Sequence, residues 1–192
     1  MRSPTRVIAC GVFSPALEHL ELDNRYPHVH VTFLPANLHL RPQQLEITLR
    51  KEITSARRRN EQVICLYGNC LPDMGSYCHH LGVVKVPGSH CFQMLLGNEE
   101  YQRIIEDIPG TYFLNSDLIV NFEEYCAEPL ELYDDEIKGL VFENYERVLY
   151  LRQPSDPDLV SRAAELAEFL HLSFEIRDVD YAHLERLLSD LV

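Results

Sequence analysis

Short apolar runs alternate with longer amphipathic stretches along this chain, and this pattern is typical of an α/β protein. Runs rich in Val, Ile, Leu and aromatic residues, bounded by Gly, Pro, Asn or Cys, predict strands. We expect strands at residues 7–9, 28–35, 62–67, 83–86, 110–115, 147–151 and 173–177. Apolar positions spaced three and four apart predict helices between them. We expect these helices at residues 14–22, 42–59, 91–107 (with an interruption at Gly97), 116–126, 134–143, 155–170 and 181–191.

The alternation of strands and helices predicts a mostly parallel sheet with helices on both faces, a Rossmann-like three-layer sandwich. A chain of 192 residues is long enough for one sizeable core. We therefore expect a single α/β domain over residues 1–192, built of two similar lobes if it divides at all. The Pro- and acid-rich segment near residues 127–135 is where such lobes would meet. The elements over residues 156–191 are expected to complete the layers around the last two strands.

A cysteine follows three of the expected strands at the point where each strand ends. Cys10 follows the first strand, Cys70 follows strand 62–67, and Cys91 follows strand 83–86. The carboxyl ends of parallel strands share one edge of a sheet, and open α/β sheets bind their ligands at that edge. The sequence therefore predicts that these three thiols converge.

A cluster of thiolates beside an imidazole is a soft site, suited to zinc or another thiophilic metal, or to an iron–sulfur cluster. Cys10, Cys70 and Cys91 are the preferred metal ligands, with His90 or His39 as a candidate fourth. No CxxC or HExxH spacing occurs, so the interpretation depends on the shared position after strands. A reactive thiolate without metal and simple packing of small side chains both stay open as alternatives.

Cys91 is also the candidate catalytic residue. It begins the expected helix 91–107, where the positive end of the helix dipole and the adjacent His90 would stabilise a thiolate. We therefore expect its thiol pKa to be depressed in the metal-free protein. Replacement of Cys91 by serine would then remove function and leave the fold intact.

A second group of candidate ligands is the run Tyr77-Cys78-His79-His80, which we expect to lie in a loop. Adjacent residues rarely all face one ion, so it is a weaker candidate. Cys65, inside an expected strand, and Cys126, near a helix end, are most simply core residues.

Composition limits the possible partners and the compartment. The formal net charge of −13 argues against nucleic acid or an anionic membrane as a main partner, because both bind basic surfaces. The N-terminal segment leads straight into a strand without an apolar signal sequence. Six cysteines without such a signal favour free thiols or metal ligands in a reducing cytoplasm over disulfides. No GxGxxG, GxxxxGK[ST] or GxSxG motif is present, so dinucleotide binding and serine acyl transfer lack support.

Several short motifs lie within roughly residues 6–125, namely Cys10-Gly11, Leu38-His39, Tyr67-Gly68-Asn69-Cys70, His90-Cys91, Leu95-Leu96-Gly97 and Gly110-Thr111-Tyr112-Phe113-Leu114. Together they resemble an uncharacterised domain-of-unknown-function family of methanogens and anaerobic or metabolically versatile bacteria. The chain departs from the family pattern at Leu71-Pro72, where glycine is usual, and at Asn98, where serine is usual. Members of this family often accompany corrinoid-dependent methyltransferase systems. The resemblance therefore implies a role in methyl transfer or in handling a cofactor such as a corrinoid.

Tyr67, Gly68 and Gly97, which lie within these motifs, are the candidate cofactor-binding residues. Two functions are compatible with these sequence features. One is a metal–thiolate enzyme, such as a methyl- or thiol-group transferase acting on a small molecule. The other is a non-catalytic protein that binds or delivers a metal or cofactor, with proteins of a corrinoid system as partners.

Overall fold

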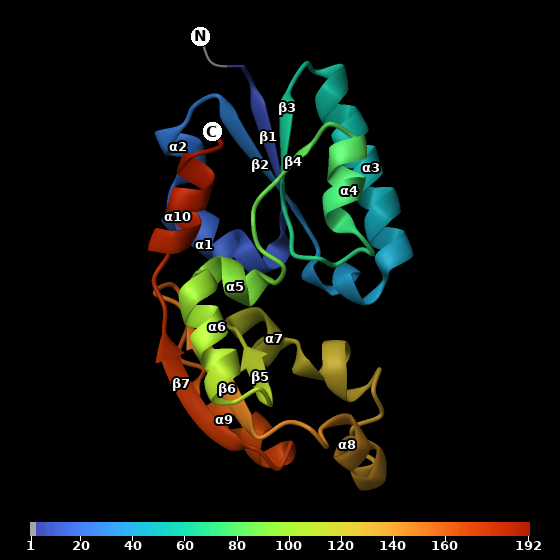
Figure 1. The fold of residues 1–192 in the computed structure, drawn as a ribbon, viewed down its shortest axis with the longest axis vertical. Coiled ribbons are helices and arrows are strands. Elements are labelled where there is room, and N and C mark those ends of the chain that lie inside the picture. The colour runs from blue at the N-terminus through green and yellow to red at the C-terminus, as the bar shows by residue number, and fades with distance from the viewer. Residues whose placement is uncertain (1–2) are drawn as a thin grey trace. The chain divides into compact units, whose positions relative to one another are not determined.

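The computed structural model describes residues 3–192, which form two compact units with separate sheets (Figure 1). The first unit comprises the chain up to Leu95 together with Tyr181–Val192, and the second is Leu96–Asp180. The second unit is therefore inserted into the first. Residues 127–135, where lobes were expected to meet, lie inside the second unit.

The first unit is built on a four-stranded parallel sheet in the order β2-β1-β3-β4. Its strands are β1 (Thr5–Cys10), β2 (Val29–Leu34), β3 (Gln62–Leu66) and β4 (Val84–Lys85). The chain passes from β1 outward to β2 and then returns across β1 to β3. It therefore reverses direction across the sheet between β1 and β3, and this reversal defines the topological switch point.

Helices cover both faces of this first sheet (Figure 1). The helices that belong to this unit are α1 (Ser14–His19), α2 (Leu22–Arg25), α3 (Pro42–Arg58), α4 (Met74–His80), α5 (Cys91–Leu96) and α10 (Ala182–Ser189), with 3₁₀ turns η1 (Gly11–Phe13) and η2 (Ala36–Leu40). Crossovers between parallel strands are right-handed. Because the β1–β2 and β2–β3 connections run in opposite directions, α1 and α2 lie on one face while α3 lies on the other. The β3–β4 connection places α4 beside α3.

The last helix, α10, packs on the first unit and not around the final strands. Leu184 and Leu188 on its inner side are fully buried. Glu185 forms an ion pair with Arg25 of α2, and the Tyr181 ring lies 5.1 Å from that of His19 in α1. The expectation that this helix completes the layers around residues 147–151 and 173–177 is wrong. Its leucine spacing predicts a buried face but does not identify the surface that buries it.

The second unit has a three-stranded parallel sheet in the order β5-β6-β7. The strands are β5 (Thr111–Leu114), β6 (Arg147–Arg152) and β7 (Ser173–Asp178). The helices are α6 (Asn98–Asp107), α7 (Ser116–Val120), α8 (Asp135–Val141) and α9 (Val160–Phe169), with a π-helical turn η3 (Glu123–Ala127).

Alternate side chains of β5 and β6 supply two cores in the second unit. Val148 and Tyr150 are fully buried in an apolar cluster with residues of α7, η3 and α9. On the opposite face, Phe113 stacks on Tyr101 of α6 with ring centroids 5.6 Å apart. The fold class of parallel sheets covered by helices is therefore confirmed, with two sheets that are consistent with two lobes.

Three local expectations differ from the structure. The helix expected over residues 91–107 is two helices, α5 and α6, because Gly97 between them adopts φ +86°. The run Tyr77-Cys78-His79-His80 is not a loop, since it ends α4, whose N-cap Asp73 accepts a hydrogen bond from the backbone of Ser76. The helix expected from residue 155 begins only at Val160, after a turn.

A buried arginine ties together three elements of the second unit. Arg147 begins β6 and is 5 % exposed. Its guanidinium donates to Thr111 Oγ1 at 2.8 Å, to Glu175 Oε2 at 3.0 Å and to the carbonyl of Ile104 at 3.2 Å. Buried charges are tolerated only when they are paired and hydrogen-bonded.

We expect Arg147→Met to destabilise the protein by about 2–4 kcal/mol, because it removes the buried hydrogen bonds to the Thr111 hydroxyl, the Ile104 carbonyl and the Glu175 carboxylate. Arg162→Met is the matched control: Arg162 is half-exposed on α9 and forms an ion pair with Glu165, so its loss should cost about 0.5 kcal/mol or less. Urea unfolding followed by circular dichroism measures both. An equal loss of unfolding free energy in the two variants would contradict the structural role of Arg147.

Candidate functional site

Three cysteines lie at the carboxyl edge of the first sheet. Cys10 is the last residue of β1, Cys70 lies in the loop between β3 and α4, and Cys91 opens α5 after β4. Cys10 and Cys70 thus flank the switch point between β1 and β3, where sheets of this topology bind ligands. Cys10 and Cys70 both act electrostatically on the thiol of Cys91, so the three lie near one another.

The absence of a side chain at Gly68 allows two of the cysteine-bearing loops to make close contact. A Cβ on Gly68 would lie 2.8 Å from the carbonyl oxygen of Ser89 and 3.2 Å from the Cα of His90. The N–H of Asn69 donates to the same Ser89 carbonyl at 2.7 Å. Only glycine permits this approach, which brings the loop of Cys70 against the start of α5. The structure therefore gives Gly68 a packing role at this edge.

Tyr67 lies among the thiols of this edge. It is 1 % exposed, and its hydroxyl is buried without a hydrogen-bond partner. Burial raises its pKa well above the usual value, and Cys10, Cys65 and Cys70 raise it further. An unpartnered buried hydroxyl carries a desolvation penalty, so it marks a position where a ligand would supply the missing hydrogen bond.

Cys91 and Cys70 are protonated at neutral pH. Burial raises the pKa of Cys91 to about 12, and the neighbouring Cys10 and Cys70 contribute to the rise, while the backbone N–H groups of Phe92 and Cys91 act in the opposite direction. The expected depressed pKa is therefore wrong. The N-terminus of α5 does favour the thiolate, but burial among protein atoms outweighs it. The pKa of Cys70 is likewise raised, chiefly by burial.

Lys85 is a cation of this site that the sequence interpretation missed. Its Nζ donates to the carbonyl of Gly88 at 2.6 Å, and burial lowers its pKa. Its charge acts to lower the pKa values of Cys65, Cys70 and Cys78. The sequence feature that could have identified it is a lysine within the apolar run 83–86, because a half-buried charge in a short strand needs a compensating partner.

A second pair of thiols lies beside this cluster. Cys65 of β3 donates a hydrogen bond to Cys78 of α4, which raises the pKa of Cys65 and lowers that of Cys78. His79 and His80 are on the exposed side of α4, where His80 Nδ1 lies 2.7 Å from the Ser76 carbonyl oxygen. The structure therefore separates Cys78 from the two histidines that follow it.

The candidate histidine ligands are exposed, unlike the thiols. His39 lies in η2 after β2, with Nδ1 2.7 Å from the Ala36 carbonyl oxygen, and His90 directly precedes α5. Within residues 3–192, no three His, Cys, Asp or Glu side chains are arranged to hold one metal ion. Gly97 belongs to the second unit, where it precedes α6.

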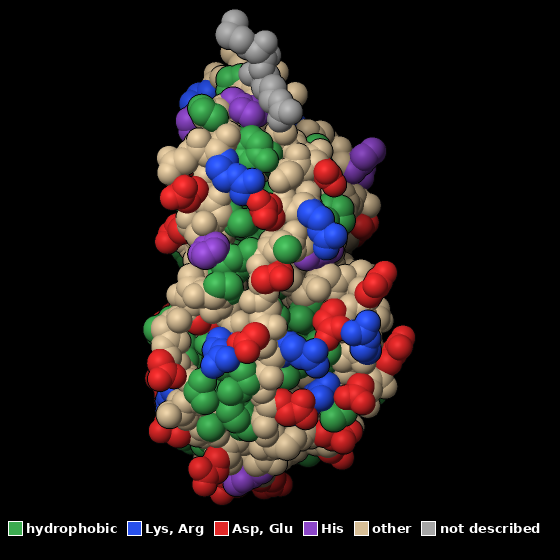
Figure 2. All heavy atoms as spheres, turned by 90° about the vertical axis from the view of Figure 1, so that its left-hand side faces the viewer, with side chains coloured by type: hydrophobic (Ala, Val, Ile, Leu, Met, Phe, Trp, Pro, Cys, Tyr) green, Lys and Arg blue, Asp and Glu red, His purple; other side chains and the backbone are tan. Residues whose placement is uncertain are grey.

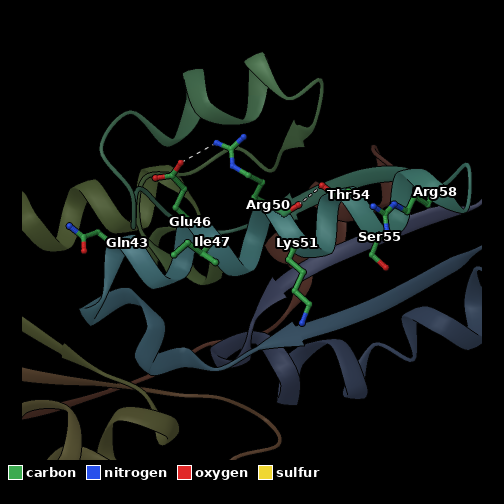
Figure 3. Close-up of a pocket in the computed structure, with 8 residues that line it drawn as sticks. All are labelled: Gln43, Glu46, Ile47, Arg50, Lys51, Thr54, Ser55 and Arg58. Atoms are coloured by element: carbon green, nitrogen blue, oxygen red, sulfur yellow. Dashed lines mark hydrogen bonds and ion pairs between the residues drawn. The ribbon is translucent and has the colours of Figure 1, made fainter.

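Surface depressions along α3 offer no comparable chemistry. Figure 3 shows one whose labelled side chains all project from this helix, with Arg50 turned toward Glu46 in an ion pair of 3.1 Å. It is lined by Gln43, Glu46, Ile47, Arg50, Lys51, Thr54, Ser55 and Arg58. These residues include neither a thiol nor an imidazole, so the thiol cluster remains the candidate site.

The fold and the site define an α/β protein with thiols at the switch point of a parallel sheet. The chain belongs to the family described as "Protein of unknown function (DUF1638)", whose model matches residues 33–188. This membership confirms the resemblance to a family of unknown function. The match includes Cys70 and Cys91, while Cys10 precedes it. The chain matches no curated protein and no solved structure. Over the described residues, no helix has the length and apolar character needed to cross a membrane.

We expect Gly68→Ala to destabilise the first unit by about 1–3 kcal/mol, because the new methyl group overlaps backbone that must shift. Gly75→Ala in α4 is the control: no atom lies within 4 Å of its new Cβ, so it should stabilise by about 0.5–1 kcal/mol through helix propensity. Urea midpoints of the two variants test this. A Gly68→Ala protein as stable as Gly75→Ala would show that the loops are not in close contact.

The raised pKa of Cys91 predicts slow alkylation at neutral pH. In the metal-free protein its reaction with iodoacetamide should be slow at pH 7 and should accelerate about tenfold per pH unit toward the pKa of about 12. Since the folded state holds the proton more tightly than the unfolded state, this group's contribution to stability declines as pH rises above the usual value of 9.0. Mass spectrometry of the Cys91 peptide gives the rates, with urea-unfolded protein as control. Fast alkylation of the folded protein below pH 7 would contradict the raised value.

Proposed function

We propose that the first unit is a metal–thiolate centre that binds zinc or another thiophilic ion through Cys10, Cys70 and Cys91. The observation that carries this proposal is the set of neighbouring thiols beside the unpartnered Tyr67 hydroxyl at the switch point. Burial and the neighbouring sulfurs oppose ionisation of Cys91. A soft cation would remove both penalties at once, because it neutralises the thiolates that otherwise repel one another.

Metal binding would require the ligand side chains to rearrange, because no set of three ligands is preformed among residues 3–192. Cys70 lies in a loop and is only half-buried, so it is the ligand best able to move toward Cys10 and Cys91. The close approach at Gly68 already brings this loop to the start of α5. Because the ligands must be deprotonated, binding should release protons and weaken as pH falls.

The number of protein ligands would decide the role of the ion. Three thiolates leave one position for a substrate, and an ion with an open position can polarise that substrate or activate a bound thiol. A fourth ligand, His90 or His39, would close the shell and favour a carrier. We propose that the fourth position of the ion is open and that the centre transfers a methyl or thiol group of a small molecule. We prefer this choice because the family resemblance implies a role near corrinoid-dependent methyltransferase systems.

A non-catalytic metal- or cofactor-delivery protein is the second candidate. The raised thiol pKa values favour it, because protons compete strongly for such thiolates and a bound ion would be released by mild acidification. Its partners would be proteins of a corrinoid or one-carbon system.

The proposed setting is a reducing cytoplasm. All six cysteines, Cys126 among them, are thiols outside any disulfide. Acidic and basic side chains are interspersed on the face shown in Figure 2, and the net charge is −13. These charges favour a small molecule or a protein over nucleic acid or an anionic membrane as partner.

Metal analysis tests the proposal directly. Untagged protein equilibrated with zinc and then desalted should retain about one ion per chain, and cobalt should give thiolate-to-metal charge-transfer absorbance. Cys10→Ser, Cys70→Ser and Cys91→Ser should each lose the ion and the absorbance, whereas Cys126→Ser in the second unit should retain both. Retention near pH 8 should exceed that near pH 6, because protons compete with the metal for the thiolates. Unchanged metal content in all three variants, or none in the wild type, would refute the metal centre.

A further inference from the structure

Buried polar atoms without partners also gather at the carboxyl edge of the second sheet. Gln153 directly follows β6, the central strand, and is 3 % exposed. Its Oε1 and Nε2 both lack a hydrogen-bond partner, and so does Asp156 Oδ1. Buried polar groups in native proteins are almost always hydrogen-bonded. Three such atoms within one four-residue turn therefore indicate a group that binds there.

The turn that carries these atoms is well fixed. Asp156 Oδ2 accepts from the Tyr150 hydroxyl at 2.9 Å and from the Gln153 backbone N–H at 2.9 Å. The Asp156 N–H donates to the Gln153 carbonyl at 3.0 Å. These bonds immobilise the carboxylate and leave Oδ1 as the acceptor for a further group. The unpartnered atoms thus belong to a preorganised turn at the edge where parallel sheets bind ligands.

The chemistry of these atoms selects a complementary ligand. The carboxamide of Gln153 presents a donor beside an acceptor, and Asp156 Oδ1 adds a second acceptor. A matching group carries an acceptor next to an –NH₂ whose two hydrogens can reach both oxygens. Adenine offers this edge at N7 and N6, which is the bidentate pairing that glutamine makes with adenine in nucleic acids. A primary carboxamide offers the same arrangement.

We propose that the second unit binds a small molecule through an amino group beside an acceptor, as on adenine or a primary carboxamide. Gln153 pairs with both atoms of that edge, and Asp156 Oδ1 accepts the second N–H. This site is independent of the thiol cluster, because all its residues belong to the second unit. Binding does not require a glycine-rich phosphate-binding loop, because the site recognises only the amino edge of the ligand.

Matched ligands test this proposal on the full-length protein. Calorimetric titration with adenosine is compared with inosine, in which an oxo group replaces –NH₂ and faces the two acceptors. Nicotinamide is compared with nicotinate in the same way. We expect the amino-bearing member of at least one pair to bind about tenfold more tightly or better. Discrimination within the adenosine pair identifies a nucleobase, and discrimination within the nicotinamide pair identifies a carboxamide.

A variant provides the second measurement. Gln153→Glu keeps the side-chain shape but removes the Nε2 donor, so the favoured ligand should bind about tenfold more weakly or worse. Gln43→Glu, on the exposed side of α3, should leave binding unchanged. Equal affinities within both ligand pairs, or no binding at millimolar concentration, overturn the proposal, as does full affinity in Gln153→Glu. If that variant does not fold, the ligand pairs on the wild-type protein decide alone.

Discussion

The candidate site depends on the absence of a Cβ atom at Gly68. The loops after β3 and β4 carry Cys70 and Cys91, and a side chain at Gly68 would force these two loops apart. At Gly68 the backbone of one loop lies where a methyl group would contact the Ser89 carbonyl at 2.8 Å. The hydrogen bond from Asn69 to that same carbonyl then fastens the loops. Two cysteines 21 positions apart in sequence are held at one edge by this single contact.

Burial determines the chemistry open to the thiols. A helix N-terminus stabilises a thiolate, yet its contribution is a fraction of a unit charge that falls off within one turn. Removal of the thiolate from water costs more, and the neighbouring sulfurs add repulsion, so Cys91 holds its proton far above neutral pH. Lys85 offsets part of the same cost for Cys70. The cluster is thus short of positive charge, and a bound cation would supply it.

The sequence was sufficient where local periodicity and strand direction determine the structure, and insufficient where tertiary packing decides. Cysteines placed after parallel strands could be assigned to one edge, because strand direction alone places them there. The protonation of Cys91 could not be predicted, since its pKa reflects burial that only the folded structure creates. The lack of a hydrogen-bond partner at the Tyr67 hydroxyl could not be predicted either, because the sequence does not show which atoms surround a tyrosine at the end of a strand. Gly97 signalled a break, but not that the chain leaves one sheet for another there.

The position of α10 has a consequence for the order in which the protein is made. Leu184 and Leu188 are fully buried parts of the first unit, yet they are synthesised after the whole of the inserted second unit, which ends at Asp180. The unit whose strands emerge first from the ribosome therefore cannot complete its core until the second unit has also been made. Throughout that interval the first unit, which carries Cys10, Cys70 and Cys91, lacks its last helix. Arrival of α10 supplies the missing part of its core.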